Sequence, residues 1–243
     1  MQTIRLHHLA APKSAAVLDL GCGNGRHVNA LYAAGFRNIV GLDLDAEKIA
    51  EAKMRLAELK ASLPPKRRGA RVTFRIGDGT RLGFADAQFR TILCSEVLEH
   101  VPHYYRVLDE IARVLAPRGW LGVSVPRQWP ETLCWWLDSN YGHAPGGHIR
   151  IFRRRELIAD IEARGFQLVR QHWAHGTHSP FWWLKSALGE PRSAEHWAVR
   201  LYHRFLVWEM FHPAARTNRA LARLLDPLMG KSLVLYFRKR ARR

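Results

Sequence analysis

Short apolar segments alternate with longer amphipathic segments along the chain from residue 17 onward. Short apolar runs are typical of buried strands, and apolar residues at helical spacing are typical of helices that pack on a sheet. The pattern predicts strands at 17–20, 39–42, 72–76, 89–94, 120–125, 166–173 and 232–237, and helices at 24–34, 46–63, 103–115 and 153–164. Such alternation predicts an α/β fold around a mostly parallel sheet.

Two segments depart from this alternation, and they are rich in tryptophan. All nine Trp residues lie at position 120 or later, most of them in or near these two segments. We expect one domain over residues 1–243, in which 127–152 form a substrate loop and 175–230 a helical lid.

Composition narrows the possible classes of protein. A chain of 243 residues with 47% hydrophobic residues can bury a large core. The net charge of +17, part of it in a basic tail at 238–243, suggests nucleic acid, anionic lipid or an acidic small molecule as a partner. Three distant cysteines without C-x-x-C spacing predict neither a disulfide framework nor a zinc finger, which fits the cytoplasm. The sequence has neither an apolar leader nor an apolar run of spanning length, so we expect no membrane-spanning segment.

The stretch "VLDLGCGNG" at 17–25 carries the strongest chemical signal. Glycines between a strand and a helix let a ligand approach the backbone, and the start of the helix offers unpaired N–H groups. The spacing is G-x-G-x-G, which matches the dinucleotide-binding pattern G-x-G-x-x-G poorly.

This stretch closely resembles the first motif of class I S-adenosylmethionine-dependent methyltransferases, D-x-G-x-G-x-G. Asp43 in "VGLDLD" matches the family acid that binds both ribose hydroxyls, and Asp78 in "RIGDGTRL" matches the acid at the adenine amino group. The resemblance implies S-adenosylmethionine as cofactor. The implied cofactor-binding residues are Asp19, Gly21, Cys22, Gly23, Asn24, Gly25, Asp43, Leu44, Asp78, Gly79 and Ser95.

The segment "FRTILCSEVLEHVPHYYRVLDEIARVLAPRGWLGVSVP" is similar to the ubiquinone- and menaquinone-biosynthesis subgroup of this family. The resemblance covers roughly residues 17–126, with fainter similarity at 148–173 and 232–238. It implies a Rossmann-like, doubly wound, seven-stranded sheet with an antiparallel last strand. Relatives usually reach that strand through a short hairpin, whereas this chain has a helical, aromatic-rich insertion there.

The family chemistry is an in-line displacement that leaves S-adenosylhomocysteine, and it needs a base only where the acceptor must lose a proton. Glu96, Glu99 and His100 have the E-x-x-E-H spacing that some relatives associate with a divalent metal, while others with near-identical strings use none. We expect no metal, and these three residues are the candidate ligands if one is used. Glu96 and His100 are also candidate catalytic residues.

His148 in "GGHIRIFRRREL" is the third candidate catalytic residue. It resembles the family histidine close to the acceptor, and an imidazole is suited to remove a hydroxyl proton near neutral pH. The alternative is a histidine that only caps a loop by hydrogen bonding.

Residues 175–230 contain two stretches with helical stripes. Trp197, Leu201, Phe205 and Trp208 share one face, with Arg200 and Arg204 on another; Leu221, Leu224, Leu225 and Leu228 form a second apolar stripe beside Arg216, Arg219 and Arg223. Either the aromatic face packs on the sheet and closes the site, or it contacts an anionic membrane. The candidate acceptor-binding residues are Trp135, Trp136, Tyr141, Phe181, Trp182 and Trp183.

The sequence therefore predicts a cytoplasmic methyltransferase, and a position at the inner face of the membrane stays open. The expected reaction is methylation of oxygen or carbon on a small apolar or amphipathic acceptor such as a quinone, lipid or secondary-metabolite precursor. One alternative is an RNA methyltransferase that uses the basic tail, although no stacking platform favours nucleic acid. Another is a non-catalytic, cofactor-binding or membrane-associated scaffold. The sequence leaves the oligomeric state open.

Overall fold

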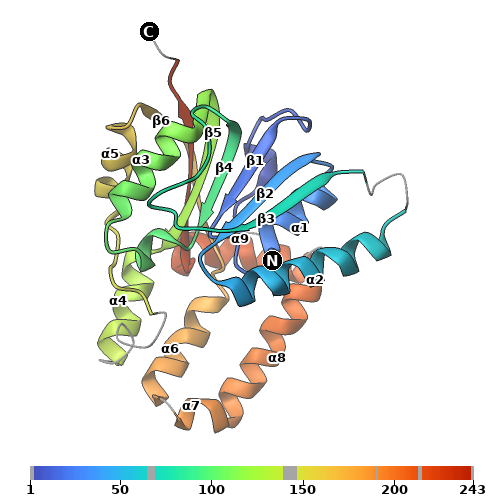
Figure 1. The fold of residues 1–243 in the computed structure, drawn as a ribbon. Coiled ribbons are helices and arrows are strands. Elements are labelled where there is room, and N and C mark those ends of the chain that lie inside the picture. Colours follow the sequence, from blue (N-terminus) through green and yellow to red (C-terminus); the bar gives the residue numbers. More distant parts are fainter. Residues whose placement is uncertain (1–2, 65–68, 139–146, 190, 213–214, 242–243) are drawn as a thin grey trace.

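Seven strands form one sheet in the order β3-β2-β1-β4-β5-β7-β6 (Figure 1). The computed structural model describes residues 3–64, 69–138, 147–189, 191–212 and 215–241. The strands are β1 (Ala16–Leu20), β2 (Asn38–Asp43), β3 (Arg71–Ile76), β4 (Phe89–Ser95), β5 (Leu115–Pro126), β6 (Phe166–Ala174) and β7 (Ser232–Lys239). Strands β1 to β5 pair in parallel, and β7 is antiparallel to both β5 and β6. The predicted sheet with an antiparallel last strand is confirmed.

Helices cover both faces of the sheet. They are α1 (Arg26–Ala33), α2 (Ala46–Ser62), α3 (Tyr104–Val114), α4 (Gln128–Leu137), α5 (Arg154–Glu162), α6 (His178–Leu188), α7 (Arg192–Glu195), α8 (Trp197–Phe211) and α9 (Arg216–Met229), with short 3-10 turns at Leu6–His8 and Leu98–His100. Successive strand residues point to opposite faces, so Val17 packs in the cluster with α1 and α2, while Leu18 packs in the cluster with α3 and α5. Burial on both faces explains why these strands are continuously apolar.

The glycine-rich stretch makes the first helix begin later in the chain than predicted. Gly21, Gly23 and Gly25 have φ values of +68°, +50° and +82°, which lie in the left-handed region. A right-handed helix cannot pass through such residues, so α1 begins at Arg26 rather than at the predicted residue 24.

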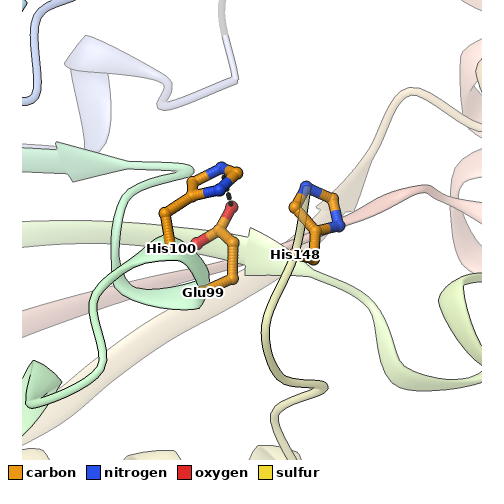
Figure 2. Close-up of side chains that lie close together, drawn as sticks. All are labelled: Glu99, His100 and His148. Carbon is orange, nitrogen blue, oxygen red and sulfur yellow. Dashed lines mark ion pairs between the residues drawn. The ribbon is translucent and has the colours of Figure 1, made fainter. Parts of the chain in front are cut away.

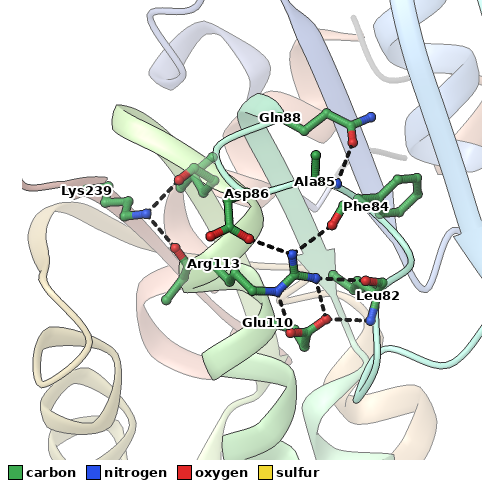
Figure 3. A network of polar contacts seen from close by, with 10 residues as sticks. Leu82, Phe84, Ala85, Asp86, Gln88, Glu110, Arg113 and Lys239 are labelled. Atoms are coloured by element: carbon green, nitrogen blue, oxygen red, sulfur yellow. Dashed lines mark hydrogen bonds and ion pairs between the residues drawn. The ribbon is translucent and has the colours of Figure 1, made fainter.

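Arg113 of α3 fixes the loop between β3 and β4 (Figure 3). Its guanidinium donates to the Glu110 carboxylate, to Asp86 Oδ1 and to the carbonyls of Leu82 and Phe84, at 2.7 to 2.8 Å. Glu110 in turn accepts from the Leu82 N–H at 2.6 Å. A planar guanidinium with five donors suits this pattern of acceptors. The network orders the segment that follows Asp78.

The insertion between β6 and β7 contains α6 to α9, and α6, α7 and α8 extend away from one end of the sheet (Figure 1). Its two ends lie together, because Ala174 pairs with Ser232. No described residue of these four helices belongs to either core cluster of the sheet. Within the described residues, no helix is long and apolar enough to cross a membrane.

The buried face of helix α8 is not the face that carries its tryptophan stripe. Trp197, Leu201 and Trp208 are 68%, 60% and 42% exposed, whereas Val199 and Leu206 are buried. The tryptophan stripe therefore does not pack on the sheet, and burial follows the opposite side of the helix.

The predicted basic tail at 238–243 begins inside the sheet. Arg238 and Lys239 belong to β7, and the Lys239 ammonium donates to the carbonyls of Ala112 and Leu115. Residues 242–243 lie outside the described residues. The predicted substrate loop at 127–152 begins as helix α4, and its residues 139–146 lie outside them as well.

Candidate functional site

The glycine loop after β1 is folded back onto the neighbouring strands. The N–H groups of Gly21 and Cys22 both donate to the Leu42 carbonyl of β2, at 2.8 and 3.0 Å. A Cβ atom on Gly21 would overlap Cγ2 of Val97, which follows β4. The loop therefore lies close to the carboxyl ends of three adjacent strands, where open α/β sheets bind ligands. Asn24 is a half-buried turn residue of the same loop.

Two acids stand at the ends of the next two strands. Asp43, at the end of β2, accepts from the Gly23 N–H through Oδ2 at 2.7 Å and from the Asp45 N–H through Oδ1 at 3.0 Å. A carboxylate has about four lone-pair positions, so both oxygens retain acceptor capacity for ribose hydroxyls. Asp78 follows β3 and is exposed, with Gly79 next to it. Leu44, 73% exposed, and Ile76, 61% exposed, supply apolar surface beside these acids.

Asp19 lies beneath the glycine loop inside the sheet. Among the described residues, neither of its buried carboxyl oxygens has a hydrogen-bond partner. Burial raises the pKa of Asp19 to about 7, and the positive charge of Arg26 opposes this rise. Burial therefore favours the protonated form of this acid in the strand that leads into the loop.

A second cluster follows β4 and contains Glu99, His100 and His148 (Figure 2). One ligand atom from each residue lies within 4.8 Å of the others, and Nε2 of His100 is 3.9 Å from Glu99 Oε1. The Glu99 carboxyl group is fully buried, and neither oxygen has a hydrogen-bond partner among the described residues. Burial raises the pKa of Glu99 well above its usual value, and the nearby Glu96 carboxylate raises it further.

Both imidazoles of this cluster are oriented through Nδ1. Nδ1 of His100 lies 3.1 Å from the Gly147 carbonyl, and Nδ1 of His148 pairs with Glu131 Oε1. A carbonyl oxygen accepts hydrogen bonds but cannot donate them. The hydrogen of His100 therefore lies on Nδ1, and its Nε2 faces the cluster. A carboxylate behind the ring, as Glu131 stands behind His148, is the usual partner of a histidine that binds a metal.

The donor set fits a divalent cation. Burial lowers the pKa of His100, which favours the neutral imidazole that a metal requires. Two ligands on opposite sides of a cation with bonds of about 2.1 Å are about 4.2 Å apart, so a pair separated by 4.8 Å would have to close slightly. The buried, unpartnered Glu99 oxygens are the observation that favours a ligand here, which is either a proton or a cation.

Glu96 does not belong to this group of three. Its φ is +55°, and its carboxylate accepts from Ser124 Oγ at 2.8 Å, which in turn lies 2.8 Å from Ser95 Oγ. Glu96 instead lines a cavity. The structure therefore brings His148 beside Glu99 and His100, whereas the Glu96 carboxylate pairs with Ser124 at the cavity.

The cavity has a volume of about 580 Å³ and lies between α6, α8 and the start of β7. It begins at Arg26, the residue after the glycine loop, and at Glu96. Its full lining is Thr3, Arg26, Glu96, His175, His178, Phe181, Trp182, Lys185, His203, Leu206, Val207, Met210, Lys231 and Ser232. A concave site with an apolar wall and convergent polar groups is typical of a small-molecule pocket.

A family model described as a methyltransferase domain matches residues 3–171. The chain belongs to the class I S-adenosylmethionine-dependent methyltransferases. It is 32% identical over 117 residues to the ubiquinone biosynthesis O-methyltransferase of Paracidovorax citrulli, which is 48% of this chain and 45% of that protein. It is 27% identical over 188 residues to the 24-methylenesterol C-methyltransferase 2 of Oryza sativa subsp. japonica, 74% of this chain and 49% of that protein.

The chain spans about half the length of these curated relatives. A solved SAM-dependent methyltransferase of Methanosarcina mazei shares its fold with a TM-score of 0.63 and 16% identity, covering 100% of both chains. Membership of the family implies S-adenosylmethionine as the methyl donor.

The candidate acceptor-binding aromatic residues fall into two groups. Phe181 and Trp182 line the cavity. Trp183 turns to α4, where its indole N–H donates to the Pro130 carbonyl at 3.0 Å, and the Trp135 indole donates to Glu131 at 3.3 Å. Trp136 is 79% exposed. Tyr141 lies outside the described residues.

Sequence reasoning missed Glu131, His175, His178 and Lys231. Glu131 and His148 are 17 residues apart in the chain, and no spacing rule pairs them. His178 opens the stretch "HSPFWW", whose tryptophans draw attention away from it. Lys231 reaches the cavity only because β7 lies next to β5 in the sheet, which the sequence pattern does not show.

Proposed function

We propose that the protein transfers the methyl group of S-adenosylmethionine to a small amphipathic acceptor bound in the cavity between α6 and α8. The observation that supports this most directly is the lining of the cavity. It combines Arg26, the residue after the glycine loop, and Glu96 with the aromatic side chains of Phe181 and Trp182. Such a cavity places one end of an acceptor beside the cofactor and its apolar part between two helices.

The binding roles follow from the strand ends. The glycine loop and Asp43 would hold the cofactor's sugar, Asp78 would accept from the adenine amino group, and Leu44 would contact the ring. The cofactor would supply an activated methyl group, which the acceptor nucleophile would take as the carbon–sulfur bond breaks and its electron pair goes to sulfur. Holding the two reactants in line supplies most of the catalysis, roughly 7 to 11 kcal/mol in the best-oriented model reactions.

An oxygen acceptor must also lose a proton, and His148 is the candidate base. Its Nδ1 pairs with Glu131, which stabilises the imidazolium that forms when the ring takes a proton. Glu99, His100 and His148 would hold a divalent cation, which when bound lowers the pKa of a hydroxyl group. We place the acceptor oxygen at the Glu96 end of the cavity, the end nearest these residues in sequence.

The names of the relatives favour a small molecule over RNA. The two relatives described above are a ubiquinone biosynthesis O-methyltransferase and a 24-methylenesterol C-methyltransferase. Both reaction types suit a cavity whose walls are largely apolar. For this chain we propose a quinone, lipid or related precursor, with O-methylation favoured by the histidine and carboxylate cluster.

The first experiment uses methyl-labelled S-adenosylmethionine with a cell extract. We expect an organic-soluble product that gains the mass of one CH₂. Trp182→Ser should reduce this product about tenfold or more, because it removes an aromatic wall of the cavity. The affinity for S-adenosylhomocysteine should not change. Trp136→Ser is the matched control, since that side chain is largely exposed. If calorimetry detects no binding of S-adenosylhomocysteine to the wild-type protein, the proposal is wrong.

A second experiment separates the base from the cation. If a cation takes part, chelation should abolish transfer, Mg²⁺ should restore it, and Glu99→Gln should lose the response. If chelation has no effect while His148→Gln reduces kcat, the base alone accounts for proton removal. Activity unaffected by both variants would exclude this cluster from the reaction.

The outer faces of α8 and α9 are proposed to rest on an anionic membrane at the cytoplasmic side. Exposed apolar residues and exposed arginines occur together there: Trp197, Leu201, Trp208, Phe211, Leu224 and Leu228 with Arg200, Arg204, Arg216, Arg219 and Arg223. The only acids of these helices are engaged elsewhere: Glu209 is buried and accepts from Thr177, and Asp226 accepts from the Gly176 N–H. Exposed aromatic and basic side chains on the same two helices suit lipid headgroups.

Vesicle sedimentation tests this contact. We expect binding to vesicles with phosphatidylglycerol and little binding to pure phosphatidylcholine. The double variant Arg200→Gln, Arg204→Gln should weaken binding about thirtyfold, since each basic residue near such a surface contributes about 1 kcal/mol. Arg55→Gln on α2 is the control. Equal binding to both kinds of vesicle, or to neither, would contradict a charge-dependent contact.

A further inference from the structure

The cavity between α6 and α8 has walls of two kinds. Phe181, Trp182, Leu206, Val207 and Met210 form the apolar wall. The remaining lining is rich in cationic and basic side chains: Arg26, Lys185 and Lys231 with His175, His178 and His203. Glu96 is the single acid among the described lining residues, so the fixed charges leave the cavity positive.

Lys231 is the cation best placed to meet a bound molecule. It lies between α9 and β7, and its ammonium is 4.7 Å from the ring centroid of Trp182. No carboxylate among the described residues lies within ion-pair distance of it, since none of the ion pairs involves Lys231. Contact with an aromatic face holds an ammonium in place without neutralising its charge.

Two histidines beside Lys231 have unsatisfied nitrogens. The rings of His175 and His178 are 5.3 Å apart between centroids. Nε2 of His175 lies 3.0 Å from Thr3 Oγ1, but its Nδ1 and the Nε2 of His178 are buried with no hydrogen-bond partner among the described residues. An unsatisfied buried donor or acceptor costs about 1 to 3 kcal/mol, so such atoms indicate a missing ligand.

Burial favours the neutral form of both rings. Burial lowers the pKa of His178 to about 4, and the positive charges of Lys231 and Arg26 lower it further. Burial also lowers the pKa of His175 well below its usual value, with His178, Arg26 and Lys231 adding to the effect. A neutral imidazole keeps one N–H donor, so His178 can add a hydrogen bond beside the charge of Lys231.

We propose that the acceptor carries an anionic group, such as a carboxylate or phosphate, and that Lys231 and His178 bind it. The apolar body of the same molecule lies against Phe181 and Trp182. The Glu96 carboxylate repels this anion and so directs it away from the cofactor end. This inference rests on the proposed function, because it assigns the cavity to the acceptor, and it narrows the acceptor to an amphipathic acid.

The probe pair is anilinonaphthalene sulfonate, an amphipathic anion, and phenylnaphthylamine, which has the same aromatic body without the charge. Both become fluorescent in apolar pockets. The wild-type protein should bind the anion at least about tenfold more tightly than the neutral probe, since a charge-assisted hydrogen bond of about 1.5 to 3 kcal/mol corresponds to about tenfold or more. Lys231→Met should remove this preference and leave the neutral probe unaffected.

Three comparisons decide the outcome. His178→Gln should weaken the anion several-fold, and Lys53→Met, at an exposed position on α2, should change neither probe. If Lys231→Met retains the preference for the anion, the proposal is wrong. If Lys231→Met instead weakens S-adenosylhomocysteine in calorimetry, the anion belongs to the cofactor's carboxylate and the proposal is also wrong. Unchanged cofactor binding together with a lost preference supports it, and failure of methyl transfer in extracts would leave this binding result standing.

Discussion

The Asp43 carboxylate accepts a hydrogen bond of 2.7 Å from the backbone N–H of Gly23. The acid at the end of β2 is thus joined to the glycine loop at the end of β1. One side chain both shapes the loop and presents acceptors to a ligand. If Asp43 binds the cofactor as proposed, cofactor binding and loop order are coupled through this one residue.

Asp43→Ala should weaken S-adenosylhomocysteine about tenfold or more, because it removes acceptors for two hydroxyl donors and releases the Gly23 N–H. Isothermal titration calorimetry measures the change. Asp45→Ala provides the control: Asp45 caps α2 by accepting from the N–H groups of Glu47 and Lys48. Its loss should cost about 1 kcal/mol of stability and leave ligand affinity unchanged. Equal affinity in wild type and Asp43→Ala would refute the assignment.

Gly21 and Gly23 should respond differently to alanine. Both have positive φ, which costs an alanine about 1 to 2 kcal/mol. At Gly21 the added Cβ would also overlap Val97, whereas at Gly23 it meets no atom within 4 Å. We expect a clearly lower melting temperature for Gly21→Ala than for Gly23→Ala. Similar melting temperatures would mean that Val97 moves aside without cost.

Asp19 predicts a pH dependence of stability. Its pKa in the folded protein is raised to about 7, so between about pH 4 and pH 7 the folded protein holds a proton that the unfolded chain releases. Stability from this group is thus present at low pH and is lost as pH rises through 7, by at most about 1.4 kcal/mol per pH unit. Urea unfolding at about pH 5 and about pH 8 should show a larger decline for wild type than for Asp19→Asn. Parallel pH profiles would show that Asp19 is ionised in the folded protein.

Arg113→Lys should destabilise the protein by about 1 to 3 kcal/mol, because an ammonium cannot serve the four acceptor groups that the guanidinium reaches. The hydrogen bond from Arg113 lowers the pKa of Glu110, so acid should weaken the same network. Chemical denaturation quantifies the loss. Arg106→Lys, on an exposed position of the same helix, should be nearly neutral. If the two variants are equally stable, the network contributes nothing to the fold.

The sequence predicted what depends on local pattern. The strand positions follow from apolar runs, and Asp43 and Asp78 follow from motifs at strand ends. Helices α4 and α6 were not predicted, because both contain proline and bulky aromatic residues in their first turns, which resemble loop composition. The buried face of α8 was also beyond the pattern: the helix has apolar residues on more than one side, and the hydrogen bond from Thr177 to buried Glu209 fixes which side turns inward.

The pairing of Ala174 with Ser232 has a consequence for the history and the engineering of this chain. Because the segment between them starts and finishes on one rung of the sheet, a tight turn can replace it without moving β6 or β7. The segment that we propose to bind the acceptor is then a unit that can be exchanged as a whole. Exchanging it between relatives should transfer acceptor preference to a recipient whose cofactor affinity stays its own.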